Sequence, residues 1–358
     1  MAQTTAAPQP SPPTPPSQTH HTIVALETFF VPIPPLTLPP GHTYTLHTYP
    51  TTTPSQIASR IRPASILILS IAPLTAALLS PSATPHLQLV ALVASGTDNV
   101  DLAACRARRV AVCNTPDANA AAVAEHALAL YFATRRSLVL SHNLLAAGRW
   151  PERRTLQGVL DAPDGRPPRT ARGETLGIVG FGAVGRLLGE SAGALGMRVL
   201  VSARKGEAEG KEDGVDIREG GRTPFRTLLR TCSVIALCLP RTPATLNLIS
   251  APELSLMPPH AILINISRGG IVDEGAVVAA LRGRRIAGYG TDVYALEPAG
   301  PHNSPLVAAG LRGEEELNLV TTPHVAWCAE DTVANFHKKL RENVRCWLET
   351  GMPKYPVG

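Results

Sequence analysis

Short runs of apolar residues alternate along the chain with polar or helical stretches, first in its amino-terminal third and again after residue 172. The first set lies at 23–26, 66–70, 87–94 and 110–113, and the second at 175–179, 198–202, 234–239, 261–266, 288–293 and 319–322. Strands that are buried on both faces read as continuous apolar runs, and helical stretches between such runs are typical of parallel sheets. The pattern therefore predicts two α/β units, each built on a parallel sheet, with no internal sequence repeat.

The segments outside these runs differ in character. Residues 1–19 are almost entirely Pro, Ser, Thr, Gln and Ala, and they predict a disordered tail because they cannot bury enough apolar surface. Residues 118–147 are rich in Ala and Leu and predict a long helix that ends before Gly148. The predicted surface loops are 151–172, 206–222 and 309–316.

The composition supports a globular protein with an aliphatic core. Hydrophobic residues make up 44% of the chain and charged residues 17%, which leaves little of the polarity that favours disorder. The stretch 63–97 carries no Asp, Glu, Lys or Arg. Pro73 interrupts its longest apolar piece, which is shorter than the roughly 20 apolar residues that a membrane-spanning helix needs. This stretch is therefore predicted to be core.

The distribution of charged residues and cysteines indicates which binding partners and which cellular compartment to expect. The net charge is +5, but the basic residues are scattered and no aromatic residues alternate with them, which favours a solvated surface over nucleic-acid binding. The 6 cysteines form no C-x-x-C pair, which favours free thiols in a reducing compartment. No secretory signal is visible at the N-terminus. A cytoplasmic protein without a metal site and without a membrane segment is expected.

A glycine-rich motif follows the strand predicted at 175–179 and precedes a helical stretch. This context indicates a dinucleotide-binding fingerprint rather than glycines that serve only a tight turn. In the fingerprint Gly180 permits the turn, Gly182 lets the backbone approach the pyrophosphate, and Gly185 allows close helix–strand packing. The helix N-terminus then offers free N–H groups to the phosphates. The predicted cofactor-binding residues are Gly180, Gly182, Ala183, Val184 and Gly185.

The strand predicted at 198–202 ends without the carboxylate that binds the adenosine ribose in NAD-dependent proteins. Ser202, Ala203, Arg204 and Lys205 stand there instead. A hydroxyl group and two cations suit a 2′-phosphate, because Arg and Lys pair with phosphate. The sequence therefore predicts a preference for NADP(H), with NAD(H) as the second cofactor. The alternative interpretation is that both cations are merely exposed loop residues.

Three polar residues follow predicted strands at the edge where open α/β sheets bind ligands: Arg268, Glu297 and His324. Singly, they have plain interpretations as a surface charge, a loop acid and a packed histidine. Together they supply what carbonyl reduction by hydride requires. A guanidinium can hold a carboxylate and polarise the neighbouring carbonyl, a histidine can donate the proton, and a carboxylate can orient that histidine. The nicotinamide would bring the hydride.

These segments and several others resemble the D-isomer-specific 2-hydroxyacid dehydrogenase family, in particular its glyoxylate/hydroxypyruvate reductases. The matching pieces follow the family's order over about residues 95–327. They are residues 95–101, 114–116, 123–126, 148–150, 180–185 and 239–245, with the segments around Arg268, Glu297 and His324.

The resemblance implies two Rossmann-like or flavodoxin-like domains with parallel sheets and an active site in the cleft between them. The dinucleotide-binding domain would span 118–324, and the substrate (catalytic) domain would combine 20–117 with 325–358. A homodimer is expected on the resemblance alone.

The resemblance also assigns roles to single residues. Arg268 would bind the substrate carboxylate, His324 would be the acid/base and Glu297 its partner. Asp292 would hold the nicotinamide carboxamide, and Asn99 stays open between a site residue and a turn-forming residue. Expected substrate contacts are Ser95, Gly96, Asn99 and Trp327, and further cofactor contacts are Val123, Ser202, Ala203, Arg204, Lys205, Leu239, Pro240, Thr245, Ser267 and His324.

The preferred function is reduction of a small 2-keto acid, such as glyoxylate or hydroxypyruvate, to the D-2-hydroxy acid; which keto acid is left open. Glu297 stands where the family's formate dehydrogenases have Gln, which argues against that activity. The alternatives are a phosphite dehydrogenase, which shares the three residues, and an NAD(P)-sensing corepressor-like binding protein. The sequence departs from relatives at Cys238, where many have a histidine, and at Ile71, where several have an arginine.

Overall fold

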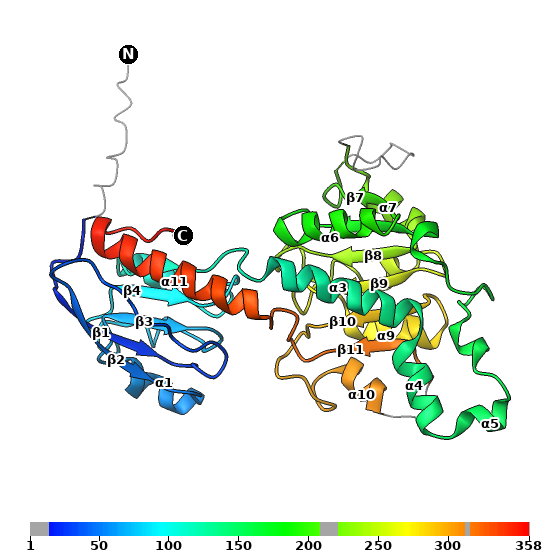
Figure 1. The fold of residues 1–358 in the computed structure, drawn as a ribbon, viewed down its shortest axis with the longest axis horizontal. Helices are drawn as coiled ribbons and strands as arrows, with labels where there is room; N and C mark the ends of the chain where they lie inside the picture. Colours follow the sequence, from blue (N-terminus) through cyan, green and yellow to red (C-terminus); the bar gives the residue numbers. More distant parts are fainter. Residues whose placement is uncertain (1–13, 208–220, 312–315, 358) are drawn as a thin grey trace, which may run out of the picture. The chain divides into compact units, whose positions relative to one another are not determined.

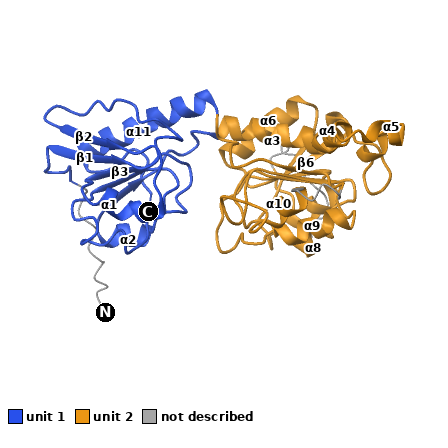
Figure 2. Cartoon of the chain, turned by 90° about the horizontal axis from the view of Figure 1, so that it is seen from below, with its two compact units in different colours: residues 1–119, 329–358 blue, residues 120–328 orange. Residues whose placement is uncertain are grey.

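The computed structural model divides the chain into two compact units (Figure 2). Unit 1 comprises residues 1–119 and 329–358, and unit 2 comprises residues 120–328. Each unit has its own parallel sheet, which confirms the predicted fold class. The described residues are 14–207, 221–311 and 316–357.

Unit 1 is built on a five-stranded parallel sheet in the order β2-β1-β3-β4-β5, which is the flavodoxin-like order. Figure 1 shows helix α11 lying along this sheet, where it contacts β4. Phe336, Leu340 and Trp347 recur at the spacing of one helix face and are buried in this contact layer. The elements are β1 (His20–Ala25), β2 (Thr43–Thr48), α1 (Pro54–Ile61), β3 (Ile66–Leu69), β4 (Leu89–Leu92), α2 (Leu102–Ala107), β5 (Ala111–Cys113) and α11 (Glu330–Thr350).

The uncharged stretch 63–97 belongs to the core of unit 1, as predicted. It contains β3 and β4, and every residue of these two strands is buried. Across the described part of the chain, no helix is both long enough and apolar enough to cross a membrane.

The structure tests the predicted disorder of residues 1–19 only over residues 14–19. Residues 1–13 lie outside the described residues, whereas residues 14–19 are described and hydrogen-bond to other parts of unit 1. The backbone N–H of Thr43 donates to the carbonyl of Thr19 at 2.8 Å, and the Gln88 amide donates to Gln18 at 3.2 Å. The prediction of disorder was therefore wrong for 14–19, because Thr19 extends the hydrogen bonding between β1 and β2.

Unit 2 is built on a six-stranded parallel sheet in the order β11-β10-β9-β8-β6-β7. Beyond β7, Thr223 pairs in parallel with Ser202 and takes the place of one more strand. With that segment included and β6 counted as the first strand, the order is 3-2-1-4-5-6-7. This is the 3-2-1-4-5-6 order of the Rossmann fold with β11 added at the far edge, and the order reverses between β6 and β8. The strands are β6 (Thr175–Val179), β7 (Arg198–Val201), β8 (Val234–Leu237), β9 (Ile262–Asn265), β10 (Gly288–Thr291) and β11 (Leu319–Thr321).

Helices cover both faces of the sheet in unit 2. Helices α3 and α6 pack together over one face, and α7, α8, α9 and α10 share the apolar cluster on the other. The strands therefore lie between two apolar layers, which explains why they read as continuous aliphatic runs. The helices are α3 (Ala120–Arg135), α4 (Leu138–Ala146), α5 (Arg149–Arg153), α6 (Ala183–Ala194), α7 (Phe225–Thr231), α8 (Ala251–Leu254), α9 (Glu274–Arg282) and α10 (Pro305–Leu311).

The single long helix predicted over 118–147 is wrong. Helix α3 ends at Arg135, and Ser137, with φ +44°, separates it from α4. The helix stops where the guanidinium of Arg135 turns inward to form an ion pair with Glu174 at 2.5 Å. This partner lies 39 residues away, so the local sequence pattern does not reveal it.

Candidate active site

The glycine motif forms the turn between β6 and α6. Gly180 has φ +93°, and a Cβ there would lie 2.5 Å from the carbonyl oxygen of Cys238. Both backbone conformation and space therefore demand glycine. A Cβ at Gly185 would lie 2.5 Å from the carbonyl oxygen of Gly180, so the first turn of α6 packs directly on the loop.

The backbone at Gly182 faces open space. A Cβ at Gly182 would meet nothing within 4 Å, and no side chain caps this end of α6. The first amides of a helix carry the positive end of its dipole and bind phosphate groups readily. The arrangement fits a dinucleotide pyrophosphate, which the backbone N–H groups of Gly182, Ala183 and Val184 would hold.

The segment after β8 lies beside this turn. The Cβ of Leu239 would be 2.8 Å from a Cβ at Gly180, so the two loops are in close contact. The hydroxyl of Thr245 donates to the carbonyl of Pro240 at 2.9 Å and closes the loop that follows. Val123, on α3, is buried in the apolar cluster on the α3–α6 face of the sheet.

The four residues after β7 have distinct surroundings. Ser202 is buried, and its hydroxyl donates to the carbonyl of Ala203 at 2.6 Å. The ammonium of Lys205 lies 2.9 Å from the carboxylate of Glu253, whereas the Arg204 side chain is 89% exposed. The charge of Lys205 is therefore compensated by a nearby carboxylate, whereas the charge of Arg204 is exposed to solvent and to a ligand.

His324 and Glu297 form a pair at the carboxyl side of the sheet. Nδ1 of His324 lies 2.6 Å from Oε2 of Glu297, and Oε1 of Glu297 accepts the backbone N–H of Tyr294 at 2.9 Å. Burial would raise the pKa of the Glu297 carboxyl, but the His324 hydrogen bond, the Tyr294 amide and the positive charge of Arg268 together lower it. Glu297 is therefore an anion at neutral pH, and it holds one ring nitrogen of His324.

A hydrogen-bonded turn after β9 presents Arg268. The buried side chain of Asn265 accepts the backbone N–H of Ser267 at 3.1 Å and the hydroxyl of Ser267 at 2.7 Å. It also donates to the carbonyl of Arg268 at 3.2 Å. A Cβ at Gly269 would overlap the carbonyl of Tyr294, so this turn packs directly against the segment that carries Glu297.

Asp292 has a positioning role that sequence reasoning did not identify. Its carboxylate is almost fully buried and accepts the backbone N–H groups of Val325 at 2.9 Å and Ala326 at 2.8 Å. It also accepts the hydroxyl of Thr322 at 2.7 Å. These bonds fix the loop after β11 on both sides of His324, which has φ +55°. A buried carboxylate usually accepts several hydrogen bonds. An aspartate directly after an apolar strand was therefore the only feature of the sequence that could have indicated the positioning role of Asp292.

The residues of unit 1 that are predicted to contact substrate form hydrogen bonds within that unit. The hydroxyl of Ser95 donates to Oδ1 of Asn119 at 3.0 Å, next to Gly96. The side-chain amide of Asn99 donates to the carbonyls of Ser70 and Ala72 at 3.3 and 2.9 Å, which gives it a turn-forming role. Within unit 2, Trp327 donates its indole N–H to the carbonyl of His324 at 3.1 Å. Substrate contacts of these residues stay predictions.

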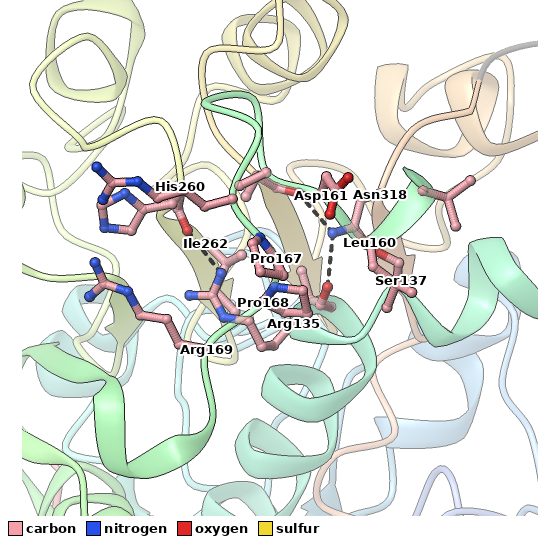
Figure 3. A pocket seen from close by; sticks show the side chains of 15 residues that line it. Arg135, Ser137, Leu160, Asp161, Pro167, Pro168, Arg169, His260, Ile262 and Asn318 are labelled. Carbon is pink, nitrogen blue, oxygen red and sulfur yellow. Dashed lines mark hydrogen bonds between the residues drawn. The ribbon is translucent and has the colours of Figure 1, made fainter. Parts of the chain in front are cut away.

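A separate cavity of about 270 Å³ lies at the amino ends of the strands of unit 2 (Figure 3). Arg135, Arg169 and His260 surround it, and His260 directly precedes β9. Because Arg268 and Asp292 follow the carboxyl ends of β9 and β10, the cavity is at the opposite edge of the sheet from the candidate active site. None of the residues predicted to bind substrate or cofactor lines it.

Comparisons with known proteins agree with this geometry. Residues 128–326 match the model of the D-isomer specific 2-hydroxyacid dehydrogenase family, NAD binding domain. The chain is 36% identical over 308 residues to a glycerate dehydrogenase of Methylorubrum extorquens, which covers 86% of this chain and 90% of that protein. It is 36% identical over 243 residues to a glyoxylate reductase of Pyrococcus furiosus, with 67% of each chain covered.

Solved structures show the same likeness. The NADPH-dependent glyoxylate/hydroxypyruvate reductase of Sinorhizobium meliloti, in complex with NADP and malonate, aligns with a TM-score of 0.71 and 26% identity. That alignment covers 94% of this chain and 97% of the other.

The fold, the glycine turn and the polar cluster together define an NAD(P)-dependent oxidoreductase of the two-domain α/β class. The chain belongs to the D-isomer specific 2-hydroxyacid dehydrogenase family. It is therefore an enzyme that acts on CH–OH donors and transfers hydride between NAD(P)H and a 2-keto acid. The alternatives of a phosphite dehydrogenase and a corepressor-like protein are not favoured by these relatives.

Proposed function

We propose that this protein is an NADPH-linked reductase of small 2-keto acids of the glyoxylate/hydroxypyruvate type, with a D-2-hydroxy acid as product. The observation that carries the proposal is the 2.6 Å contact between His324 and Glu297, next to a turn that presents Arg268. Relatives named as glyoxylate reductase and glycerate dehydrogenase support this substrate class.

Each of the three residues has a defined task in this reaction. The guanidinium of Arg268 holds the substrate carboxylate, because its planar fork matches two carboxylate oxygens. His324, held at Nδ1 by Glu297, has Nε2 left to donate a proton to the carbonyl oxygen. The negative charge of Glu297 stabilises the imidazolium before that transfer. A nicotinamide cofactor, when bound, supplies the hydride.

The proposed cofactor preference rests on the end of β7. No carboxylate occurs among residues 202–205, and an arginine and a lysine stand there. A carboxylate would accept hydrogen bonds from an unmodified ribose and repel a 2′-phosphate, whereas cations attract that phosphate. The solved relative from Sinorhizobium meliloti is named as NADPH-dependent.

The proposal extends to assembly and location. Helices α3 to α5 expose large apolar side chains, among them Phe132, Leu138 and Trp150, as expected of a surface that binds a second copy. The 6 cysteines are free, which suits the reducing cytoplasm. A homodimer in the cytoplasm fits both observations.

A panel of 2-keto acids tests the proposed function. Purified protein is mixed with NADPH and, separately, glyoxylate, hydroxypyruvate, pyruvate and a branched-chain keto acid, and the nicotinamide absorbance is followed. We expect turnover that is fastest with glyoxylate or hydroxypyruvate. Turnover confined to the branched-chain acid would overturn the proposed substrate class, and no turnover with any acid would overturn the reductase assignment.

A further inference from the structure

Residues 221–223 of unit 2 bring a third cation to the end of β7. The Nη1 atom of Arg222 donates to the carbonyl of Ser202 at 3.1 Å. Its neighbour Thr223 is fixed by two backbone hydrogen bonds, from the N–H of Ala203 at 2.8 Å and to the carbonyl of Val201 at 2.8 Å. Arg222 is thus placed beside β7 by a strand-like ladder.

The lysine at the end of β7 forms an ion pair with a carboxylate of the protein. Lys205 lies 2.9 Å from Oε1 of Glu253, whose side chain is 10% exposed. The second oxygen of Glu253 accepts the N–H and the hydroxyl of Ser250 at 3.1 and 2.8 Å, at the start of α8. Burial favours the neutral acid, yet these hydrogen bonds keep the pKa of Glu253 below its usual value. The positive charge of Lys205 is therefore already compensated.

Arg204 differs from Lys205 in this respect. The described carboxylate nearest to its guanidinium belongs to Glu207, at 4.0 Å, and both side chains are largely exposed. An exposed pair at this distance contributes little, because water and salt screen it. Arg204 can therefore turn to a ligand at small cost.

We propose that Arg222 is a specificity-determining residue that binds the 2′-phosphate of NADP(H) together with Arg204. Lys205 instead anchors the loop through its ion pair with Glu253. The inference rests on the proposed NADPH preference and deepens it. A guanidinium presents two donors in one plane, which matches a phosphate better than an ammonium does. Ser202, buried with its proton donated to Ala203, supplies backbone support rather than a phosphate contact.

Steady-state kinetics with both cofactors test this assignment. Arg222→Gln should lower kcat/KM for NADPH by about tenfold to a hundredfold, mainly through KM, because a hydrogen bond to a charged group is lost. The value for NADH should stay within about twofold, since the ribose hydroxyl needs no cation. Lys205→Gln should keep the ratio of the two cofactors within about threefold, because that charge is already paired. Arg230→Gln, on the exposed end of α7, is the matched control.

Calorimetric binding of 2′,5′-ADP and of 5′-AMP gives a readout that does not depend on turnover. We expect Arg222→Gln to weaken 2′,5′-ADP alone, and circular dichroism to show an unchanged fold. If wild type prefers NADH, the proposed cofactor preference itself fails. If wild type prefers NADPH and Arg222→Gln keeps that preference, or Lys205→Gln abolishes it, the assignment of Arg222 is overturned while the preference stands.

Discussion

At the scale of single residues, the hydrogen bond between His324 and Glu297 decides which ring nitrogen can do chemistry. With Nδ1 2.6 Å from the Glu297 carboxylate, the proton on that nitrogen is held, and Nε2 is left for a substrate. The carboxylate is itself held by the backbone N–H of Tyr294, so the pair has one preferred orientation. Catalysis by a general acid depends on such fixed geometry before it depends on acidity.

Removal of the histidine tests its role as proton donor. His324→Ala should lower kcat for keto-acid reduction by about 10²–10⁴-fold, which is the usual contribution of general acid–base catalysis. KM for NADPH should change little, because the glycine turn and the cations at the end of β7 are proposed to hold the cofactor. Steady-state kinetics measure both constants, and His302→Ala, an exposed histidine of the same unit, serves as control. A kcat within about threefold of wild type would contradict the assignment.

Glu297→Gln tests the electrostatic part of the pair. Because the pKa of Glu297 is lowered by its bonds to His324 and Tyr294 despite burial, the side chain is negative across the working pH range. That charge balances the positive charge of the imidazole ring that donates the proton. Wild type loses the charge only when acid protonates Glu297, whereas Glu297→Gln lacks it at every pH, so we expect kcat for reduction to fall at neutral pH and to lose the part of its acid limb that depends on this carboxyl. A profile of kcat against pH that superimposes on wild type would show that Glu297 only positions the ring.

At the scale of elements, the carboxyl ends of β9, β10 and β11 collect the catalytic groups because parallel strands end at one edge of the sheet. Loops after these strands are fixed by two buried polar side chains: Asn265, the last residue of β9, and Asp292, which directly follows β10. At the opposite edge, Arg135 at the end of α3 fixes the helix by a buried ion pair with Glu174 and by donating to the carbonyls of Ser233 and His260 at 2.8 Å each.

Glu174→Gln measures what that buried pair contributes. It leaves the guanidinium of Arg135 buried without its counter-charge, and removal of one partner from such a pair costs about 3–5 kcal/mol. Urea unfolding followed by circular dichroism should show the loss as a lower midpoint. Glu349→Gln, which breaks the exposed Arg345–Glu349 pair on α11, should leave the midpoint unchanged. Equal midpoints for Glu174→Gln and wild type would contradict the role given to the buried pair.

At the scale of the whole molecule, unit 2 is inserted in the sequence between the two segments that form unit 1. Helix α11, near the end of the chain, therefore packs on the sheet whose first strand begins at His20. Helices α3, α4 and α5 of unit 2 expose several large apolar side chains. Where such side chains form one patch, that patch usually marks a site for a partner.

Solution mass tests whether that partner is a second copy. Light scattering after size-exclusion chromatography should give twice the mass of one chain for wild type. Leu138→Asp combined with Trp150→Glu should shift the protein toward the monomer, because charges would have to be buried in the contact. Leu195→Asp, which changes an exposed apolar residue at the end of α6, should leave the mass unchanged. A monomeric wild type would contradict the proposed homodimer.

Much of the fold could be predicted because its signals are local. The aliphatic runs became strands of two parallel sheets, and the glycine motif formed a strand–turn–helix. The break in the helix at Ser137 and the order of residues 14–19 could not be predicted. Both depend on partners far along the chain, Glu174 for α3 and Thr43 for the tail segment.

The sequence by itself determined which chemical groups are available: three glycines at the spacing of a nucleotide-binding turn, and an arginine, an acid and a histidine that each follow a strand. These properties belong to residues and their neighbours in the chain. The tertiary structure decided which groups act on which. It paired His324 with Glu297, placed Asp292 under the histidine loop, bound Lys205 to Glu253 and brought Arg222 to the end of β7. Such pairs lie tens of residues apart, and only the packing of strands and helices brings their atoms within hydrogen-bonding distance.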